Sequence, residues 1–206
     1  MTQGGEKIHN INMIIVGLGN PGVEYENTRH NTGRMILDMF RQKNDLPEWQ
    51  EDKKLKSLIS KKNKITLLLP ETFMNKSGEA IAKIIKSKKA AESLVVIHDD
   101  LDLPLGRFKI SFNRGAGGHR GVQSIVKLLK TGAFTRIRVG IASVTPSGKI
   151  KKPIGEKAVI DFILGKFKDK ELETFKKTAK KISEAIEMIA AKGREKAMAK
   201  SNRSTI

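Results

Sequence analysis

The 206-residue sequence contains no cysteine. This absence excludes a disulfide framework, thiolate zinc sites, iron–sulfur clusters and a cysteine nucleophile. It fits a cytoplasmic protein without requiring one. A chain of this length buries a sizeable core without such covalent or metal cross-links.

Long apolar runs and aromatic side chains are also scarce. No run approaches the roughly 18 apolar residues of a transmembrane helix, and residues 1–10 lack the apolar core of a signal peptide. We therefore expect no membrane as a partner. Aromatic residues make up 5% of the chain, which argues against a platform that stacks successive bases of a single strand.

Positive charge, by contrast, is abundant. The chain carries 40 basic and 22 acidic residues, for a net charge of +18. Such an excess favours a polyanionic partner, nucleic acid first and an anionic membrane second. The alternative is a lysine-rich composition without function, since only ten of the basic residues are arginine, the better bidentate phosphate ligand.

Apolar patterns predict strands and helices in alternation. We expect strands at 12–16, 55–60 (an edge strand), 65–69, 94–97, 107–112 and 136–142. We expect helices at 32–43, 77–85, 122–129, 158–164 and 170–200. This order predicts a single α/β domain with a twisted mixed, largely parallel sheet flanked by helices. The domain is expected to cover 12–198, between a flexible N-terminal tail at 1–11 and a frayed C-terminal tail at 199–206.

The stretch VGLGNPGVEYENTRHNTG, residues 16–33, follows the first expected strand. Its glycines match G-x-G-x-x-G, the dinucleotide-binding pattern. That site also needs a helix opening within the glycines, but the residues after Gly22 are too polar and aperiodic for one. No second strand ends in an acidic residue about 20 positions later. A dinucleotide-dependent enzyme is thus the less favoured alternative.

Metal and covalent chemistry have little support. The four histidines are never paired at helical ligand spacing. Asp99, Asp100 and Asp102 follow a strand, where aspartates are as often turn formers as Mg²⁺ ligands. No G-x-S-x-G nucleophile motif is present. We expect no metal and no covalent intermediate, which leaves general acid–base chemistry.

His30 is the natural general base, because its ordinary pKa lies nearest neutrality. An imidazole in that role needs an orienting acceptor, and Asp99 sits just beyond a buried strand, at the same sheet end if the strands are parallel. Asn20 and Asn75 lie in the polar loops after the strands that end at 16 and 69, and they can read a peptide group or steady an oxyanion. A structural role for His30 and turn formation by the asparagines are the open alternatives.

Four motifs appear in a characteristic order and spacing: GLGNPGVEYENTRHNTG, LLPETFMNKSGEA, HDDLDLPLG and GAGGHRG. Together they resemble bacterial peptidyl-tRNA hydrolase, from about residue 13 to 190. The resemblance implies hydrolysis of the ester between a peptide and the 3′ ribose of tRNA, which recycles tRNA from prematurely released peptidyl-tRNA. It also implies a cytoplasmic monomer with no cofactor, no metal and no obligate protein partner. A non-catalytic RNA-binding module is the alternative that charge alone would support.

The same resemblance assigns roles to individual residues. His30 matches the base that activates water, Asp99 the carboxylate that orients it, and Asn20 the residue that tells N-blocked from free aminoacyl-tRNA. The wall that receives the peptide and the tRNA 3′ end is matched by Tyr25, Phe73, Met74 and Asn75. Arg138 resembles a basic residue that holds the tRNA 5′ phosphate.

One position departs from the family pattern. The glycine loop usually reads Gly-His-Asn-Gly, whereas this chain has Arg120 in place of the asparagine. Arginine has donors only and a fixed charge, so it cannot accept a hydrogen bond from water. Two outcomes follow: Arg120 pairs with a phosphate or carboxylate and strengthens tRNA binding, or it swings to solvent and leaves the role to Asn75.

Overall fold

The computed structural model describes residues 12–203, and the expected N-terminal tail at 1–11 lies outside them. One mixed sheet has the strand order β2-β3-β4-β1-β5-β7-β6, with β8 paired to β7. The four central strands are parallel: β4 (Ile65–Pro70), β1 (Met13–Gly17), β5 (Leu94–Pro104) and β7 (Thr135–Val144). The outer strands are antiparallel: β2 (Gln50–Asp52), β3 (Ser57–Lys62), β6 (Phe108–Phe112) and β8 (Ile150–Lys151). The predicted α/β class with a mixed sheet is confirmed.

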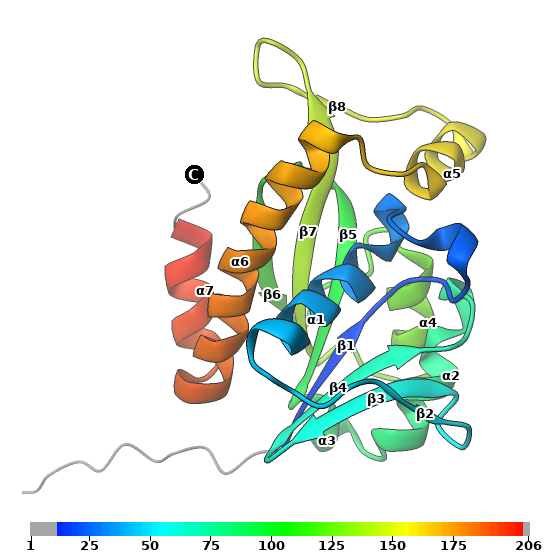
Figure 1. Cartoon of the computed structure of the whole chain (residues 1–206), viewed down its shortest axis with the longest axis vertical. Helices are drawn as coiled ribbons and strands as arrows, with labels where there is room; N and C mark the ends of the chain where they lie inside the picture. Colours follow the sequence, from blue (N-terminus) through cyan, green and yellow to red (C-terminus); the bar gives the residue numbers. More distant parts are fainter. Residues whose placement is uncertain (1–11, 204–206) are drawn as a thin grey trace, which may run out of the picture.

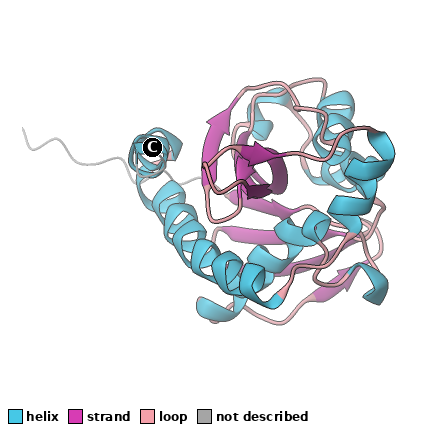
Figure 2. Cartoon of the chain, turned by 90° about the horizontal axis from the view of Figure 1, so that it is seen from above, coloured by secondary structure: helices cyan, strands magenta, loops and turns pink. Residues whose placement is uncertain are grey.

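Helices cover both faces of this sheet (Figures 1 and 2). One face packs against α1 (Thr32–Lys43), α6 (Asp169–Lys192) and α7 (Arg194–Arg203). The other packs against α2 (Ser77–Ile84), α3 (Lys88–Ala91) and α4 (Arg120–Leu129). Ile15 and Val16 of β1 enter opposite clusters, because successive side chains of a strand point to opposite faces. Burial on both faces explains why the central strands are continuous apolar runs.

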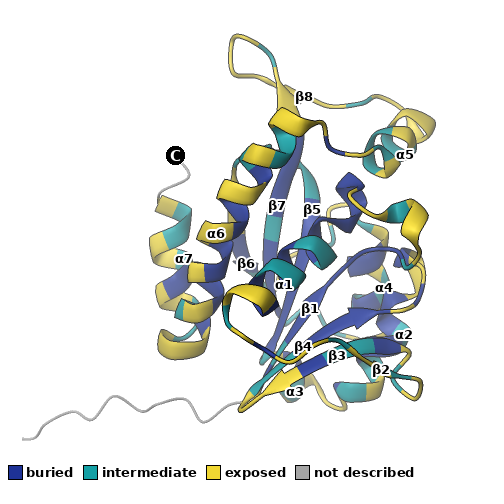
Figure 3. Cartoon of the chain, viewed as in Figure 1, coloured by how far each residue is buried: buried dark blue, intermediate teal, exposed yellow. Residues whose placement is uncertain are grey.

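The expected helix at 170–200 is in fact two helices. Gly193 has φ 81 and separates α6 from α7, a backbone conformation that favours glycine. Figure 3 shows the buried stripe of α6 facing the sheet and its exposed residues facing outward.

The frayed tail predicted at 199–206 is wrong for residues 199–203, which belong to α7. The Asn202 side chain donates to the Ile110 carbonyl and accepts from the Ile110 N–H, each at 2.9 Å. These bonds occupy the open edge of β6, and Ala197 of α7 is fully buried. A strand is confirmed close to the predicted range 55–60, as β3, but it does not lie at the edge of the sheet, because β2 pairs outside it.

Three short 3₁₀ segments and one isolated helix complete the fold around a single edge of the sheet. They are η1 (Val23–Tyr25), η2 (Arg29–Asn31), η3 (Met74–Lys76) and α5 (Glu156–Leu164). No residue of α5 is fully buried. Within residues 12–203, no helix combines the length and apolarity needed to cross a membrane. The loops that follow β1 and β4 meet at the carboxyl ends of the parallel strands, where α/β proteins form ligand crevices.

Candidate active site

A cleft of about 750 Å³ opens at this edge of the sheet. Most of the predicted site residues line it: Asn20, His30, Phe73, Met74, Asn75, Asp99 and Arg120. Tyr25 does not line the cleft but packs edge-on against Phe73, with ring centroids 6.4 Å apart. Arg138 also lies outside it, in a neighbouring pocket. The structure therefore brings seven of the predicted site residues together in one cleft and leaves Tyr25 and Arg138 beside it.

The glycines of the first loop bring this cluster together by close backbone packing. A Cβ on Gly33 would lie 2.3 Å from the carbonyl oxygen of Ile97, and one on Gly17 would lie 2.5 Å from the carbonyl oxygen of Gly33. The helix that follows opens at Thr32, not within the glycines. The loop thus lacks the helix N-terminus that a dinucleotide pyrophosphate needs, and its glycines serve packing.

His30 and Asp99 are in direct contact. His30 lies in η2, and its Nδ1 is 3.0 Å from Asp99 Oδ1 and 3.1 Å from Oδ2. Both residues are buried, at 7% and 4% exposure. A proton on Nδ1 donated to the carboxylate leaves Nε2 with the lone pair. That is the tautomer a general base requires.

Burial and charge oppose each other in this pair. Burial alone would lower the His30 pKa, but the charge and hydrogen bond of Asp99 outweigh it, so the pKa is raised despite an opposing effect of Arg120. Burial would raise the Asp99 pKa, but His30 and His119 hold that pKa well below its usual range. Asp99 is therefore ionised at neutral pH and stabilises a positive charge on the imidazole.

A second histidine, which the sequence pattern did not indicate as a site residue, shares the same carboxylate. His119 Nε2 is 3.0 Å from Asp99 Oδ1. Its Nδ1 accepts from the N–H of Val122 at 3.3 Å, at the start of α4. This bond assigns the proton to Nε2, so His119 donates to Asp99. The only sequence signal was a histidine in a glycine loop directly before a helix.

His98 contacts both the backbone of Asp99 and the ring of His119. Its Nδ1 is 2.7 Å from the Asp99 carbonyl oxygen, and its ring lies edge-on to the His119 ring at 4.6 Å. Burial, followed by the proximity of His119, lowers the His98 pKa well below its usual value. His98 is thus a neutral donor that supports the backbone of Asp99. It too was missed, since it lies within a buried strand.

His30, Asp99 and His119 are also the group among residues 12–203 whose ligand atoms lie close enough to hold a metal, all within 4.8 Å of one another. The ring nitrogens that would bind an ion instead contact the carboxylate at 3.0 Å. Hydrogen bonding therefore accounts for their closeness without an ion.

Asn20 is held from two directions, by the backbone of Met74 and by the side chain of Asn31. Its Oδ1 accepts from the N–H of Met74 at 2.8 Å. Its own N–H and carbonyl pair with the Asn31 side chain at 2.8 and 2.9 Å. The bond from Met74 fixes the amide orientation and leaves the Nδ2 donors for a ligand.

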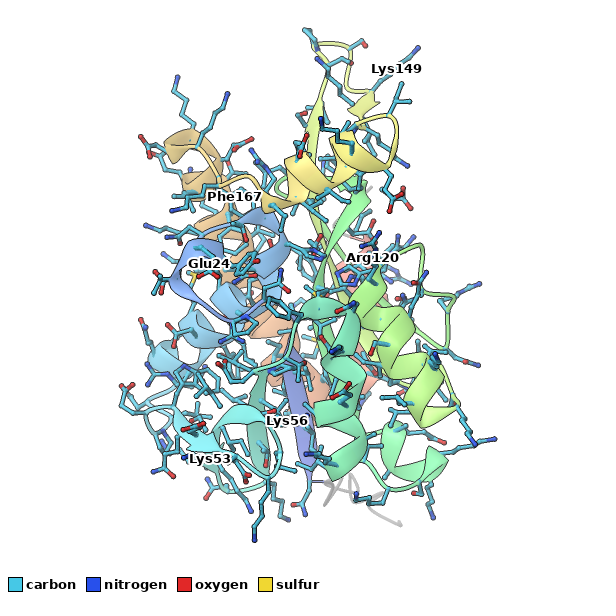
Figure 4. All side chains as sticks on the ribbon, turned by 90° about the vertical axis from the view of Figure 1, so that its right-hand side faces the viewer. Glu24, Lys53, Lys56, Arg120, Lys149 and Phe167 are labelled. Atoms are coloured by element: carbon cyan, nitrogen blue, oxygen red, sulfur yellow. The ribbon has the colours of Figure 1, made fainter. Side chains whose placement is uncertain are left out.

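Arg120 pairs with a carboxylate, which is the contact that the first of the two expected outcomes requires. It is the first residue of α4, and its Nη2 is 2.5 Å from Glu156 Oε1 at the start of α5. Both side chains are more than half exposed, and Figure 4 shows Arg120 between these two helices. Both residues line the cleft.

Arg138 lies in a second pocket of about 470 Å³ that adjoins the cleft. Its Nε is 2.6 Å from Asp100 Oδ2. Three further basic residues line this pocket: Lys109, Arg114 and Arg136. Desolvation, followed by repulsion from Arg138, lowers the pKa of Arg136. Such a group of cations favours an anionic ligand.

The fold and the cleft together define a class: a single-domain α/β protein in which a carboxylate-held histidine faces an open cleft, as in hydrolases that activate water. A family model described as peptidyl-tRNA hydrolase matches residues 14–206. The peptidyl-tRNA hydrolase of Thermodesulfovibrio yellowstonii is 40% identical over 190 residues, covering 86% of this chain and 90% of that protein. This chain belongs to the peptidyl-tRNA hydrolase family, which confirms the resemblance carried by the four motifs.

Two further comparisons agree. The peptidyl-tRNA hydrolase of a Thermoanaerobacter species is 40% identical over 194 residues, covering 92% of this chain and 98% of that protein. The crystal structure of peptidyl-tRNA hydrolase from Acinetobacter baumannii matches with a TM-score of 0.82 and 29% identity, covering 96% of this chain and 97% of that one.

Proposed function

We propose that this chain hydrolyses the ester bond between a peptide and the 3′ ribose of tRNA, with His30 as the base that activates water. The observation that carries the proposal is the contact between His30 Nδ1 and both oxygens of Asp99, inside the cleft of a family member. The steps need no cofactor. The protein acts as a cytoplasmic monomer that returns tRNA to translation after ribosomes release peptidyl-tRNA.

The proposed reaction has two stages. Nε2 of His30 removes a proton from water while the water oxygen attacks the ester carbonyl. The tetrahedral intermediate then collapses, the bond to the ribose 3′ oxygen breaks, and His30 returns its proton to that oxygen. The products are the free peptide carboxylic acid and tRNA. Asp99 stabilises the imidazolium throughout, and His119 holds Asp99 from the other side.

Asparagine amides supply the neutral donors for this chemistry. Asn20 presents Nδ2 donors to the cleft, and we assign it the recognition of the peptide group that distinguishes an N-blocked substrate from a free amine. Asn75 is exposed in the same cleft and is placed to steady the oxyanion. Phe73, 56% exposed, forms the peptide-binding wall, with Met74 behind it and Tyr25 bracing its ring.

Cations on either side of the cleft are assigned to the tRNA. Arg138 and its basic neighbours form the pocket that we assign to the 5′ phosphate. Arg120 is assigned to the acceptor end, where it exchanges Glu156 for a phosphate. An exposed ion pair of this kind stabilises by only about 0–1 kcal/mol, so a backbone phosphate of the acceptor end can displace it.

The experiment compares N-acetyl-aminoacyl-tRNA with unblocked aminoacyl-tRNA as substrates of the purified protein. Release from the blocked substrate alone is the expected result, and His30→Ala should lose most turnover while it retains tRNA binding. Binding without hydrolysis would establish an RNA-binding module instead. Asn20→Asp retains the acceptor for the Met74 N–H but has no amide donors, so it should lose the preference for blocked substrate.

A further inference from the structure

Arg29, the residue directly before His30, is a buried cation that the proposed reaction does not use. It is 7% exposed. Its Nη2 is 2.7 Å from Glu171 Oε2, and its Nη1 donates to the Phe162 carbonyl oxygen at 3.3 Å. The guanidinium also lies 4.5 Å from the centre of the Phe162 ring. A buried charge destabilises a protein unless it is paired. The three contacts satisfy this cation, and they also fix its position between two segments of the chain.

These contacts join the segment that carries His30 to the turn between α5 and α6. The Arg29 N–H donates to the Gly165 carbonyl oxygen at 3.0 Å, and the Phe167 N–H donates to the Asn27 carbonyl oxygen at 3.1 Å. In Figure 1 the blue segment lies beside this orange turn, and Figure 4 places Phe167 above the same segment. Glu171 also accepts from the Lys168 N–H at 2.8 Å, so one carboxylate both caps α6 and binds Arg29.

The far side of this turn is α5, which forms part of the cleft. Its apolar side chains that line the cleft are Val159, Ile160, Ile163 and Leu164. No residue of α5 is fully buried, so packing alone holds this helix weakly. Arg29 therefore contacts α5, which lines the cleft, and is joined through the backbone to His30, the residue proposed as base.

We propose that Arg29 is a positioning residue, whose guanidinium fixes η2 against the α5–α6 turn and so holds the His30 imidazole on Asp99. The planar fork suits this role because it binds a carboxylate and a carbonyl while it stacks on an aromatic ring. Lysine has the same charge but neither the fork nor the stacking surface. The inference rests on the proposed role of His30.

Arg41 offers a matched control within the same chain. It is equally buried, at 6% exposure, and bonds to Asp38 at 3.0 Å and Glu48 at 2.8 Å. Its guanidinium lies 5.9 Å from the Trp49 ring centre. It is near the end of α1 and does not line the cleft. Arg41→Lys therefore reproduces the loss of a buried, stacked arginine without touching the His30 segment.

The test measures kcat and KM on N-acetyl-aminoacyl-tRNA across pH for the parent, Arg29→Lys and Arg41→Lys. We expect kcat to fall about tenfold in Arg29→Lys, with a smaller change in KM, and to stay within about twofold of the parent in Arg41→Lys. Methylguanidinium added to Arg29→Ala should restore part of the lost turnover.

The acid limb of the pH profile gives a readout that a stability defect alone would not move. Asp99 raises the His30 pKa, and Arg120 opposes that effect; His119 shares Asp99 from the other side. If His30 loosens from Asp99, its pKa falls toward the ordinary value, and the acid limb moves to lower pH. The charge at position 29 is unchanged in the lysine variant, so the shift reports geometry.

An NMR titration of His30 in the free protein separates this inference from the proposed reaction. A lower His30 pKa in Arg29→Lys, but not in Arg41→Lys, supports the positioning role even if His30→Ala proves active and the assigned base is wrong. The inference is overturned if Arg29→Lys matches Arg41→Lys in stability loss and the parent in kcat, acid limb and His30 titration. If circular dichroism shows Arg29→Lys unfolded, Glu171→Gln is read by the same criteria.

Discussion

Asp99→Asn is the most informative single substitution in the cleft, because it changes charge and donor pattern while it preserves shape. Oδ1 of Asp99 lies 3.0 Å from both His30 Nδ1 and His119 Nε2, and Oδ2 lies 3.1 Å from His30 Nδ1. Two imidazole N–H donors thus converge on a group with two acceptor oxygens. An amide has one acceptor oxygen and one NH₂ group, which only donates.

Either orientation of that amide disturbs His30. If the amide oxygen takes the Oδ1 position, the new NH₂ group faces the His30 Nδ1 proton, and the two donors repel. If the NH₂ group takes that position, the amide oxygen still accepts from His30 Nδ1 at the Oδ2 position, but the NH₂ group faces the N–H donors of both His30 and His119, which pushes the imidazoles away. The loss of one charge-assisted hydrogen bond costs roughly 1.5–3 kcal/mol, which corresponds to a fall in kcat of about 10- to 150-fold.

Steady-state hydrolysis of N-acetyl-aminoacyl-tRNA measures this fall, with tRNA binding by filter retention as the control. We expect binding to stay within about twofold and the residual activity to exceed that of His30→Ala, because the base itself remains. Turnover within threefold of the parent would refute the orienting role of Asp99. A loss equal to that of His30→Ala would show that the carboxylate does more than orient.

Three further substitutions test separate parts of the structure. Arg120→Asn should raise the pKa of His30, since Arg120 lowers it, and the acid limb of kcat/KM should then move to higher pH. We also expect equal or higher turnover on the plateau and weaker tRNA binding at moderate salt. An acid limb that moves to lower pH would contradict this. His98 has a pKa well below its usual value, so below about pH 6.5 the unfolded chain binds a proton that the folded chain does not. The free energy of unfolding therefore falls by up to about 1.4 kcal/mol for each pH unit of acidification. His98→Asn should flatten the pH dependence of the urea-derived free energy of unfolding between pH 6.5 and 5, and an unchanged slope would count against this. Gly33→Ala places a Cβ 2.3 Å from a β5 carbonyl oxygen and should destabilise by about 3 kcal/mol, whereas Gly115→Ala, which meets no atom within 4 Å, should leave the thermal midpoint unchanged.

The sequence predicted the parts of this molecule that depend on local pattern. Buried strands read as apolar runs, and polar residues after three of them indicated a cleft that contains His30, Asp99 and Asn20. This works because carboxyl ends of parallel strands share one edge. The resemblance then assigned roles within that cleft, which the contact between His30 and Asp99 makes chemically coherent.

Contacts between distant elements could not be predicted in the same way. His119 reaches Asp99 only because β6 intervenes and turns the chain back, and no periodicity encodes that return. Glu156 reaches Arg120 from α5, 36 positions away. The end of α7 was mistaken for a frayed tail because its polar face carries little apolar signal, while Asn202 anchors it through backbone bonds to the edge strand.

The arrangement around Asp99 explains how a buried carboxylate stays ionised in this core. Removal of a charge from water costs several kcal/mol unless hydrogen bonds and opposite charge offset it. Two imidazole donors supply those bonds, and the neutral His98 beneath supports the backbone without adding a competing charge. The same low dielectric that makes the charge costly strengthens its hold on His30. His119 is therefore expected to act on turnover through Asp99: in His119→Asn the carboxylate keeps one imidazole, and the His30 pKa should change more than tRNA affinity does.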